Sequence, residues 1–234
     1  MIAGNIKLVR EKIESKCVEI GRNSEEIKLI AVSKNFGPDD ITAAFDSGIT
    51  DFGENKAQEL NSKFEVLGNK MTWHFIGHLQ KNKVKFAIRS AEYIHSVDSL
   101  SLADEINKKA EQINKAQKIL LQVKTSDEET KSGVENEDEI FSLVDSSNRL
   151  KNIELIGLMT IAPFTDNEEE IRKSFRYLRK LRDDLNTKGF KNINELSMGM
   201  TSDFEIAIEE GATMLRIGSA IFGQRDYSKN QKDK

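Results

Sequence analysis

The sequence has little of what stabilises secreted or membrane-bound proteins. Cys17 is its single cysteine, so no disulfide can form within the chain, and we expect a reducing, cytoplasmic location. No stretch is long and apolar enough to cross a bilayer as a helix, and no secretory signal is recognisable at the start. The formal net charge of -4 provides no broad basic surface for nucleic acid. We therefore expect neither a membrane protein nor a nucleic-acid-binding one.

Breaks between domains are also lacking. The chain contains two prolines among 234 residues and no segment with the composition of a linker. Its length suits one large domain, and we expect a single domain over residues 1–234 whose polar tail, about 228–234, is frayed. An amphipathic helix is predicted at about 5–20, where Cys17 shares an apolar stripe with Ile6 and therefore packs into the core.

Short apolar segments rich in β-branched and aromatic residues recur along the chain and predict strands. Helical patterns lie between them: one runs from Pro38 to Gly48, and another carries an apolar stripe over 171–185. This alternation indicates a parallel sheet, and its length and repeat number fit a (β/α)8 TIM barrel with an extra N-terminal helix. A doubly wound sheet is the alternative, but no glycine-rich dinucleotide fingerprint follows the first strand. The predicted strands are 28–33, 49–53, 71–77, 91–97, 118–123, 153–159, 193–198 and 212–218.

Unusual residues follow most of the predicted strands, at the end where a parallel barrel forms its active site. The first strand ends at Lys34, and the last two run into "LSMGMTSDFE" and "RIGSAIFG". Ser202 and Glu205 fit a capping box that would begin a helix. Hydroxyl residues and glycines at helix starts favour an anion, so these two segments predict a phosphate site. Its candidate residues are Ser197, Gly199, Thr201, Ser202, Gly218 and Ser219.

Lys34 has two interpretations. Its ammonium group could extend from the barrel rim into water, as lysine usually does. Alternatively, desolvation lowers the pKa of the amine, which then forms an imine with a carbonyl compound. The first and eighth strands are neighbours in a closed barrel, so a phosphorylated carbonyl compound would reach both Lys34 and the phosphate site. This geometry favours the second interpretation, although Lys124 and Lys131 are alternative amines that composition does not separate from Lys34.

A series of motifs occurs in this order: "AVSK", "GEN", "WHFIGHLQKNK", "HSVDS", "KTSDEETKSG", "GLMTIAP" and "LSMGMTSDFEIAIEEGATMLRIGSAIFG". The series resembles the pyridoxal phosphate homeostasis protein family, whose members are similar to the barrel domain of alanine racemase standing alone. The resemblance covers nearly the whole chain after the first helix, and its last motif is long and specific. It implies a protein that binds pyridoxal 5′-phosphate (PLP) and acts in PLP and vitamin B6 homeostasis.

The resemblance also implies roles for individual residues, none of them catalytic or metal-ligating. Lys34 would hold PLP as a Schiff base, and Arg216 would lie beside the pyridine nitrogen, which a cation at contact distance keeps unprotonated. Lys124 stands where the family pattern leads us to expect asparagine. The phosphate would be held by Ser197, Thr201, Gly218 and Ser219, and Asn55 and Met198 would line the cofactor.

An enzyme is the first alternative: a PLP-dependent amino-acid racemase, or a lysine-dependent aldolase acting on a phosphorylated sugar. A racemase needs acid–base groups on both faces of the substrate carbon. Related racemases draw the second group from an additional domain, and Tyr93, Tyr177 and Tyr227 do not lie at a convincing motif position for it. A ring kept unprotonated is also a poor electron sink. We therefore expect PLP binding without turnover.

Two further alternatives concern metal and partners. A metal hydrolase would use His74, His78 and His95, but His74 and His78 fall in a strand and turn, where a spacing of four has no helical meaning. The charged helices are most simply solvated faces, but they could dock apo PLP-dependent enzymes that receive the cofactor. We expect a monomer, because the chain lacks a second domain that would build a site shared between subunits.

Overall fold

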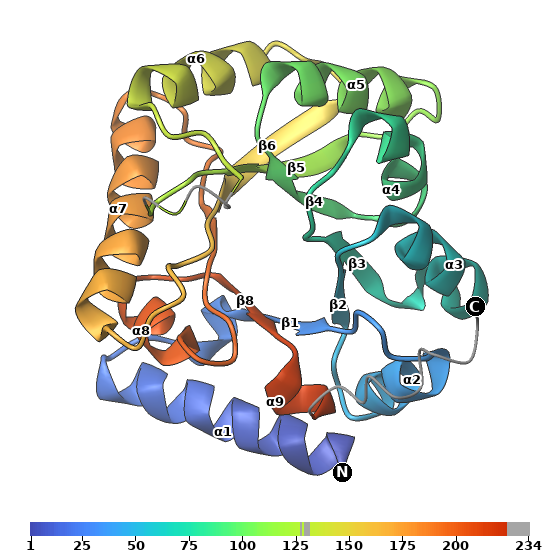
Figure 1. Cartoon of the computed structure of the whole chain (residues 1–234), viewed down its shortest axis with the longest axis vertical. Helices are drawn as coiled ribbons and strands as arrows, with labels where there is room; N and C mark the ends of the chain where they lie inside the picture. Colours follow the sequence, from blue (N-terminus) through green and yellow to red (C-terminus); the bar gives the residue numbers. More distant parts are fainter. Residues whose placement is uncertain (127, 129–131, 224–234) are drawn as a thin grey trace.

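The computed structural model describes residues 1–126, 128 and 132–223. Within them, parallel strands pair in chain order and close into a barrel where β1 meets β8, with helices around the outside (Figure 1). The predicted TIM barrel is confirmed, and the doubly wound sheet is wrong. The predicted frayed tail, 228–234, lies outside the described residues. The strands are β1 (Lys28–Val32), β2 (Asp51–Glu54), β3 (Thr72–Phe75), β4 (Tyr93–Val97), β5 (Gln117–Gln122), β6 (Ile153–Met159), β7 (Glu195–Ser197) and β8 (Met214–Ile217).

Each strand leads into a helix that covers the outside of the barrel. None of the helices in the described ranges has the length and apolar content that crossing a membrane requires. The α-helices are α1 (Ile2–Glu19), α2 (Pro38–Asp46), α3 (Ala57–Leu67), α4 (Val84–Ser90), α5 (Leu100–Glu111), α6 (Glu137–Ser147), α7 (Glu168–Thr187), α8 (Phe204–Glu209) and α9 (Ser219–Phe222). Short 3-10 turns are η1 (Ser24–Glu26), η2 (Gly68–Lys70) and η3 (Lys81–Lys83).

The extra N-terminal helix, α1, is present and packs against α2, α8 and α9 (Figure 1). Cys17 and Ile6 are both buried on its inner face, as the apolar stripe predicts. At its first turn, the side-chain amide of Asn5 donates a hydrogen bond to the carbonyl of Ile221, at 2.9 Å. α1 is therefore fastened to α9.

One predicted helix start is wrong. The capping box of Ser202 and Glu205 does not form, because Asp203 is the N-cap of α8 and its carboxylate accepts a hydrogen bond from the N–H of Met200. The chain thus turns one residue later than the capping box requires. As a result, Ser202 precedes the cap and stays exposed at the carboxyl end of the barrel.

The barrel interior differs from the layer outside it. The main hydrophobic core lies between the sheet and the helices. A second, smaller apolar cluster contains Ile30, Leu120, Met159 and Met214, whose alternation along the strands places them inside the barrel. This small cluster shares the interior with buried polar side chains. An interior of this kind can carry hydrogen bonds from one end of the barrel to the other.

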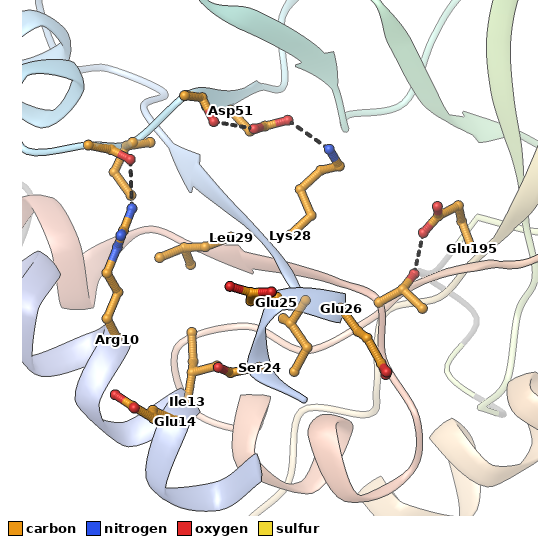
Figure 2. A pocket seen from close by; sticks show the side chains of 15 residues that line it. Arg10, Ile13, Glu14, Ser24, Glu25, Glu26, Lys28, Leu29, Asp51 and Glu195 are labelled. Carbon is orange, nitrogen blue, oxygen red and sulfur yellow. Dashed lines mark hydrogen bonds and ion pairs between the residues drawn. The ribbon is translucent and has the colours of Figure 1, made fainter. Parts of the chain in front are cut away.

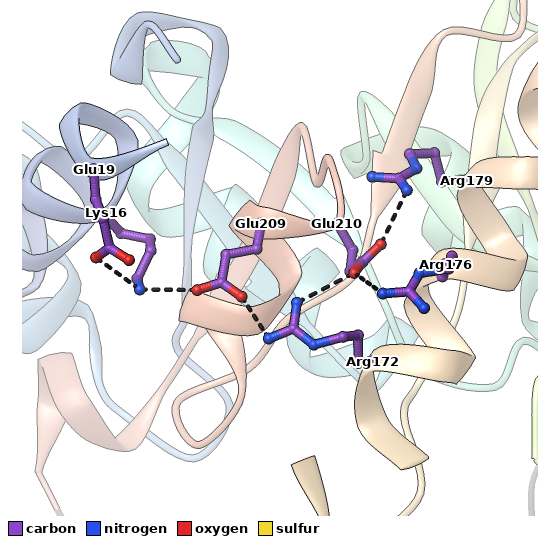
Figure 3. A network of polar contacts seen from close by, with 7 residues as sticks. All are labelled: Lys16, Glu19, Arg172, Arg176, Arg179, Glu209 and Glu210. Atoms are coloured by element: carbon purple, nitrogen blue, oxygen red, sulfur yellow. Dashed lines mark hydrogen bonds and ion pairs between the residues drawn. The ribbon is translucent and has the colours of Figure 1, made fainter. Parts of the chain in front are cut away.

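A network of ion pairs joins α1, α7 and α8 (Figure 3). At its centre, the Glu210 side chain is 4% exposed. Beside it, Glu209 bridges from α7 to Lys16 of α1, at 2.8 Å. Three cations approach the buried carboxylate of Glu210 from one face of α7. These are the guanidinium groups of Arg172 (3.2 Å), Arg176 (3.0 Å) and Arg179 (3.2 Å).

Replacing the buried carboxylate is therefore expected to destabilise the fold. Glu210→Gln should lower the free energy of unfolding by about 2 kcal/mol, because it weakens the charge-assisted hydrogen bonds that the buried side chain accepts from Arg172 and Arg176. Glu209→Gln is the matched control: its side chain is 23% exposed, and its loss should have an effect of about 1 kcal/mol or less. Urea unfolding of both variants measures the difference. Equal losses in the two variants would contradict the assigned role of Glu210.

Candidate functional site

A cavity of about 570 Å³ opens at the carboxyl ends of the strands. We call it the mouth cavity. Loops that follow strands on opposite sides of the barrel contribute to its wall, so residues far apart in the sequence meet there. From the predicted site, the lining includes Lys34, Asn55, Thr201, Arg216, Gly218 and Ser219. The sequence-based prediction missed most of the apolar wall, which is formed by Val32, Ile76, Ile161 and Met200.

Lys34 is half-buried and lies in a turn that directly follows β1. The backbone of its two neighbours, Ser33 and Asn35, is held by side chains of α3. The carbonyl of Ser33 accepts a hydrogen bond from Lys63 Nζ (2.9 Å), and the N–H of Asn35 donates to Glu59 Oε1 (2.8 Å). Asn35 has a φ of 68°, which is uncommon outside glycine and is tolerated best by asparagine and aspartate. The turn that presents Lys34 is therefore fixed on both sides.

Glu54, at the end of β2, completes the cluster beneath this turn and is fully buried. Its Oε1 accepts hydrogen bonds from Ser33 Oγ (2.6 Å) and Lys63 Nζ (2.7 Å), while within the described ranges nothing donates to Oε2. Burial raises the pKa of Glu54 to about 7, against the opposing effects of Lys63 and Ser33. A carboxyl group that titrates near neutral pH thus supports the backbone next to Lys34.

Arg216 forms part of the wall where the mouth cavity reaches into the barrel, and only 4% of the residue is exposed. Its Nη1 donates to Ser197 Oγ (2.7 Å) and its Nη2 to the carbonyl of Thr160 (2.8 Å). Burial lowers the pKa of Arg216 to about 10, and the nearby charge of Asp203 opposes the shift. The guanidinium group therefore remains cationic at neutral pH and is held in one orientation.

The structure does not bring Ser197 and Met198 into the lining of the mouth cavity. Both are fully buried, and the hydroxyl of Ser197 lies 2.8 Å from a ring nitrogen of His95. Met200 lines the cavity from the same loop. Gly199 separates the two methionines with a φ of 92°, and a Cβ there would lie 2.6 Å from that of Ala207. In the sequence, Gly199 was the signal that the backbone turns between Met198 and Met200.

Lys124 faces a different cavity. This second cavity, of about 860 Å³, lies beside α7, and Lys124 pairs there with Glu135. Lys131, the other alternative amine, lies outside the described residues. A third cavity, of about 640 Å³, opens at the opposite end of the barrel from Lys34 and contains Asp51 and Glu195 (Figure 2). We call it the base cavity.

The histidines considered for a metal site are not gathered in one place. His74 and His95 lie 2.9 Å apart inside the barrel, whereas the side chain of His78 is 60% exposed, 3.7 Å from Asp98. In the part of the chain that the structure describes, no group of three or more His, Cys, Asp or Glu residues is arranged to hold a metal ion.

Comparison with known proteins defines the class first. The family described as "Alanine racemase, N-terminal domain" matches residues 8–226. A crystal structure of an unknown protein from Bifidobacterium adolescentis has a TM-score of 0.89 at 35% identity, and the match covers 94% of each chain. The chain is thus a barrel of the same type as the N-terminal domain of alanine racemases. The match to this domain covers nearly the whole chain.

Two further relatives define the family within this class. The "Pyridoxal phosphate homeostasis protein" of Aquifex aeolicus (strain VF5) is 44% identical over 220 residues, which is 94% of this chain and 96% of the relative. PipY of Synechococcus elongatus PCC7942, whose structure is described with PLP bound, has a TM-score of 0.84 at 32% identity and is matched over 95% of this chain and 100% of PipY. The chain belongs to the pyridoxal phosphate homeostasis protein family, which confirms the resemblance found in the sequence.

Glu54 gives a prediction about pH. Its pKa of about 7 in the folded protein lies above the usual 4.5, so folding favours the protonated carboxyl. The stability it contributes is complete below about pH 4.5 and is lost as the pH rises through about 7. The difference in unfolding free energy between the protein and Glu54→Gln should change by about 3 kcal/mol across that range, measured by urea unfolding at several pH values.

Glu59 provides the control, because its carboxylate is hydrogen-bonded to the same Lys63 but its pKa is lowered. Burial acts to raise that pKa, and the hydrogen bonds from Lys63 and Asn35 outweigh it. Its stabilisation is present above its usual pKa and is lost as the pH falls, so Glu59→Gln should show the opposite slope in acid. If the difference in unfolding free energy between the protein and Glu54→Gln did not change with pH, the raised pKa of Glu54 would be refuted.

Proposed function

We propose that the chain binds PLP in the mouth cavity and acts in PLP (vitamin B6) homeostasis, with the cofactor held as a Schiff base on Lys34. The observation that carries this proposal is that Lys34 and Arg216 line one cavity together with the hydroxyls of Thr201 and Ser219. The family relation supports it, because PipY is described with PLP bound. Lys34 would supply the amine for this bond: its nitrogen would replace the aldehyde oxygen, which would leave as water with the two amine protons.

The lining of the mouth cavity fits the cofactor chemically. The apolar side chains of Val32, Ile76, Ile161 and Met200 suit the two faces of an aromatic ring. The hydroxyls of Thr201 and Ser219 belong to adjacent loops and suit a phosphate group. A volume of about 570 Å³ falls within the range of small-molecule sites. The residues present therefore match a flat ring that carries an aldehyde and a phosphate.

Each lining group has a separate task in this proposal. Bound PLP supplies a reactive aldehyde on an electron-withdrawing ring. Lys34 provides the amine, and the fixed turn around it aims that amine into the cavity. Arg216 has only donors, so it holds the ring nitrogen by a hydrogen bond without giving up its proton. Thr201, Gly218 and Ser219 hold the phosphate, and Asn55 lines the cofactor. Ser197 holds Arg216 in place by accepting its hydrogen bond.

The same lining supports binding without turnover. Of the described residues that line the mouth cavity, only Lys34 and Arg216 carry an ionisable side chain. Tyr93 stacks on His74 within the barrel, and Tyr177 lines the cavity beside α7; Tyr227 lies outside the described residues. A second acid–base group for racemisation is thus not among the described lining residues. We therefore propose a cytoplasmic, monomeric carrier of PLP whose recipients are apo PLP-dependent enzymes.

Two matched lysine variants test the covalent link. The protein and Lys124→Ala should each show a visible band with added PLP and should gain one reduced PLP group after borohydride treatment. Lys34→Ala should show neither, because its cavity lacks the amine. Absorption spectra and mass spectrometry of the digested protein locate the modified lysine. If Lys124→Ala alone lost the signal, the assignment to Lys34 would be wrong.

An activity assay separates the carrier from the enzyme alternatives. The PLP-loaded protein is incubated with common L-amino acids, and the optical rotation is followed over time. We expect no loss of rotation beyond that caused by free PLP. A sustained loss that disappears in Lys34→Ala would establish a racemase and overturn the proposal of binding without turnover.

A further inference from the structure

A continuous series of buried hydrogen bonds connects the two ends of the barrel. We call it the interior chain. Arg216 Nη1 lies 2.7 Å from Ser197 Oγ, which lies 2.8 Å from His95 Nδ1. His95 Nε2 is 2.9 Å from His74 Nδ1, and His74 Nε2 is 2.8 Å from Asp51 Oδ1. Ser197, His74 and His95 are fully buried. The interior chain thus leads from the wall of the mouth cavity to the base cavity.

The two ends of the interior chain fix its direction. Arg216 carries only donors and the carboxylate of Asp51 only acceptors. His74 must therefore donate its Nε2–H to Asp51. Because burial lowers the pKa of His74, its ring is neutral at neutral pH, and its Nδ1 is left to accept from the Nε2–H of His95. The Nδ1 of His95 then accepts from the hydroxyl of Ser197, whose oxygen accepts from Arg216. With both imidazoles neutral, every bond has one donor and one acceptor when both rings are protonated on Nε2.

The charges around the interior chain agree with this arrangement. Burial lowers the pKa of both imidazoles, and the positive charges near His95, including Arg216, lower its pKa further. For Asp51, burial acts to raise the pKa, but the hydrogen bond from His74 and the charge of Lys28 outweigh it and lower the pKa. Neutral histidines therefore lie between a cation and an anion.

We propose that Asp51, at the far end of the barrel, positions Arg216 through His74, His95 and Ser197, and that this set holds the guanidinium in place against the ligand ring. The reverse arrangement would direct the Nδ1–H of His95 at Ser197 Oγ, where Arg216 also donates, and would leave the proton of Ser197 to find another acceptor. With His74 neutral, a carboxylate at position 51 prevents that reversal, because it cannot donate to His74 Nε2.

This inference rests on the proposed function for its effect on PLP, but the interior chain itself does not. Asp51, His74, His95 and Ser197 are positioning residues that act on the ligand only through Arg216. Asp51 is the member that can be changed farthest from the mouth cavity, since it lies in the wall of the base cavity (Figure 2).

The first experiment uses the protein without PLP. Because the chain has three histidines, nitrogen-15 NMR gives three imidazole patterns. At neutral pH we expect His74 and His95 both as neutral Nε2–H tautomers, with slow exchange of the Arg216 guanidinium protons. In Asp51→Asn the amide both donates and accepts, so the tautomers should become mixed and the Arg216 protons should exchange faster. A proton on Nδ1 of either buried histidine in the unsubstituted protein would overturn the inference.

The second experiment uses the PLP-loaded protein and a matched control. Asp51→Asn and Glu195→Gln each remove one carboxylate from the base cavity, but Glu195 bonds to Thr213 and takes no part in the interior chain. We expect the position and ratio of the PLP absorption bands to change in Asp51→Asn, to stay as in the unsubstituted protein in Glu195→Gln, and to be restored in Asp51→Glu, which keeps an acceptor-only end.

The outcomes separate this inference from the proposed function. Equal changes of the PLP absorption bands in Asp51→Asn and Glu195→Gln would show an effect of net charge and would refute positioning through the interior chain. Unchanged bands in Asp51→Asn would also refute it. If the unsubstituted protein fails to take up PLP on Lys34, the proposed function is wrong. In that case the histidine tautomers and the exchange rate of the Arg216 guanidinium protons, both measured in the protein without PLP, still decide whether Asp51 positions Arg216.

Discussion

The pairing of β1 with β8 is the contact on which the candidate site depends. In this parallel ladder Ile30 lies opposite Arg216 and Ala31 opposite Ile217, so the loops that follow the two strands meet. Lys34 and Gly218 come from near opposite ends of the described chain, and only closure of the barrel brings them to one cavity. A one-residue slip in this register would turn Arg216 away from the interior, because side chains alternate along a strand.

The mouth cavity is supported by two separate buried polar systems. One lies under Lys34, where Lys63, Glu54 and Glu59 hold the backbone on both sides of the lysine. The other lies under Arg216, where the interior chain runs to Asp51. In both, a residue that lines the mouth cavity is held by side chains that do not line it. Preorganisation of this kind lowers the ordering that binding would otherwise require.

The sequence predicted the barrel well and the site in part. All of the strands lie close to their predicted ranges, because alternation of short apolar segments with helical patterns is a local property. The missed features depend on contacts between distant segments. Glu54 and Lys63 meet only when α3 packs beside β2, and His74 meets His95 only through the pairing of β3 with β4. The resemblance placed Met198 in the lining, but Met198 is buried and Met200 lines the cavity, because the backbone turns at Gly199, where φ is 92°.

The bond from Asn5 to Ile221 has a consequence for protein synthesis. α1 leaves the ribosome well before α8 and α9, which belong to the surface that it covers. The mouth cavity is likewise incomplete until β8 closes against β1. A nascent chain therefore cannot assemble this cavity before β8 has left the ribosome.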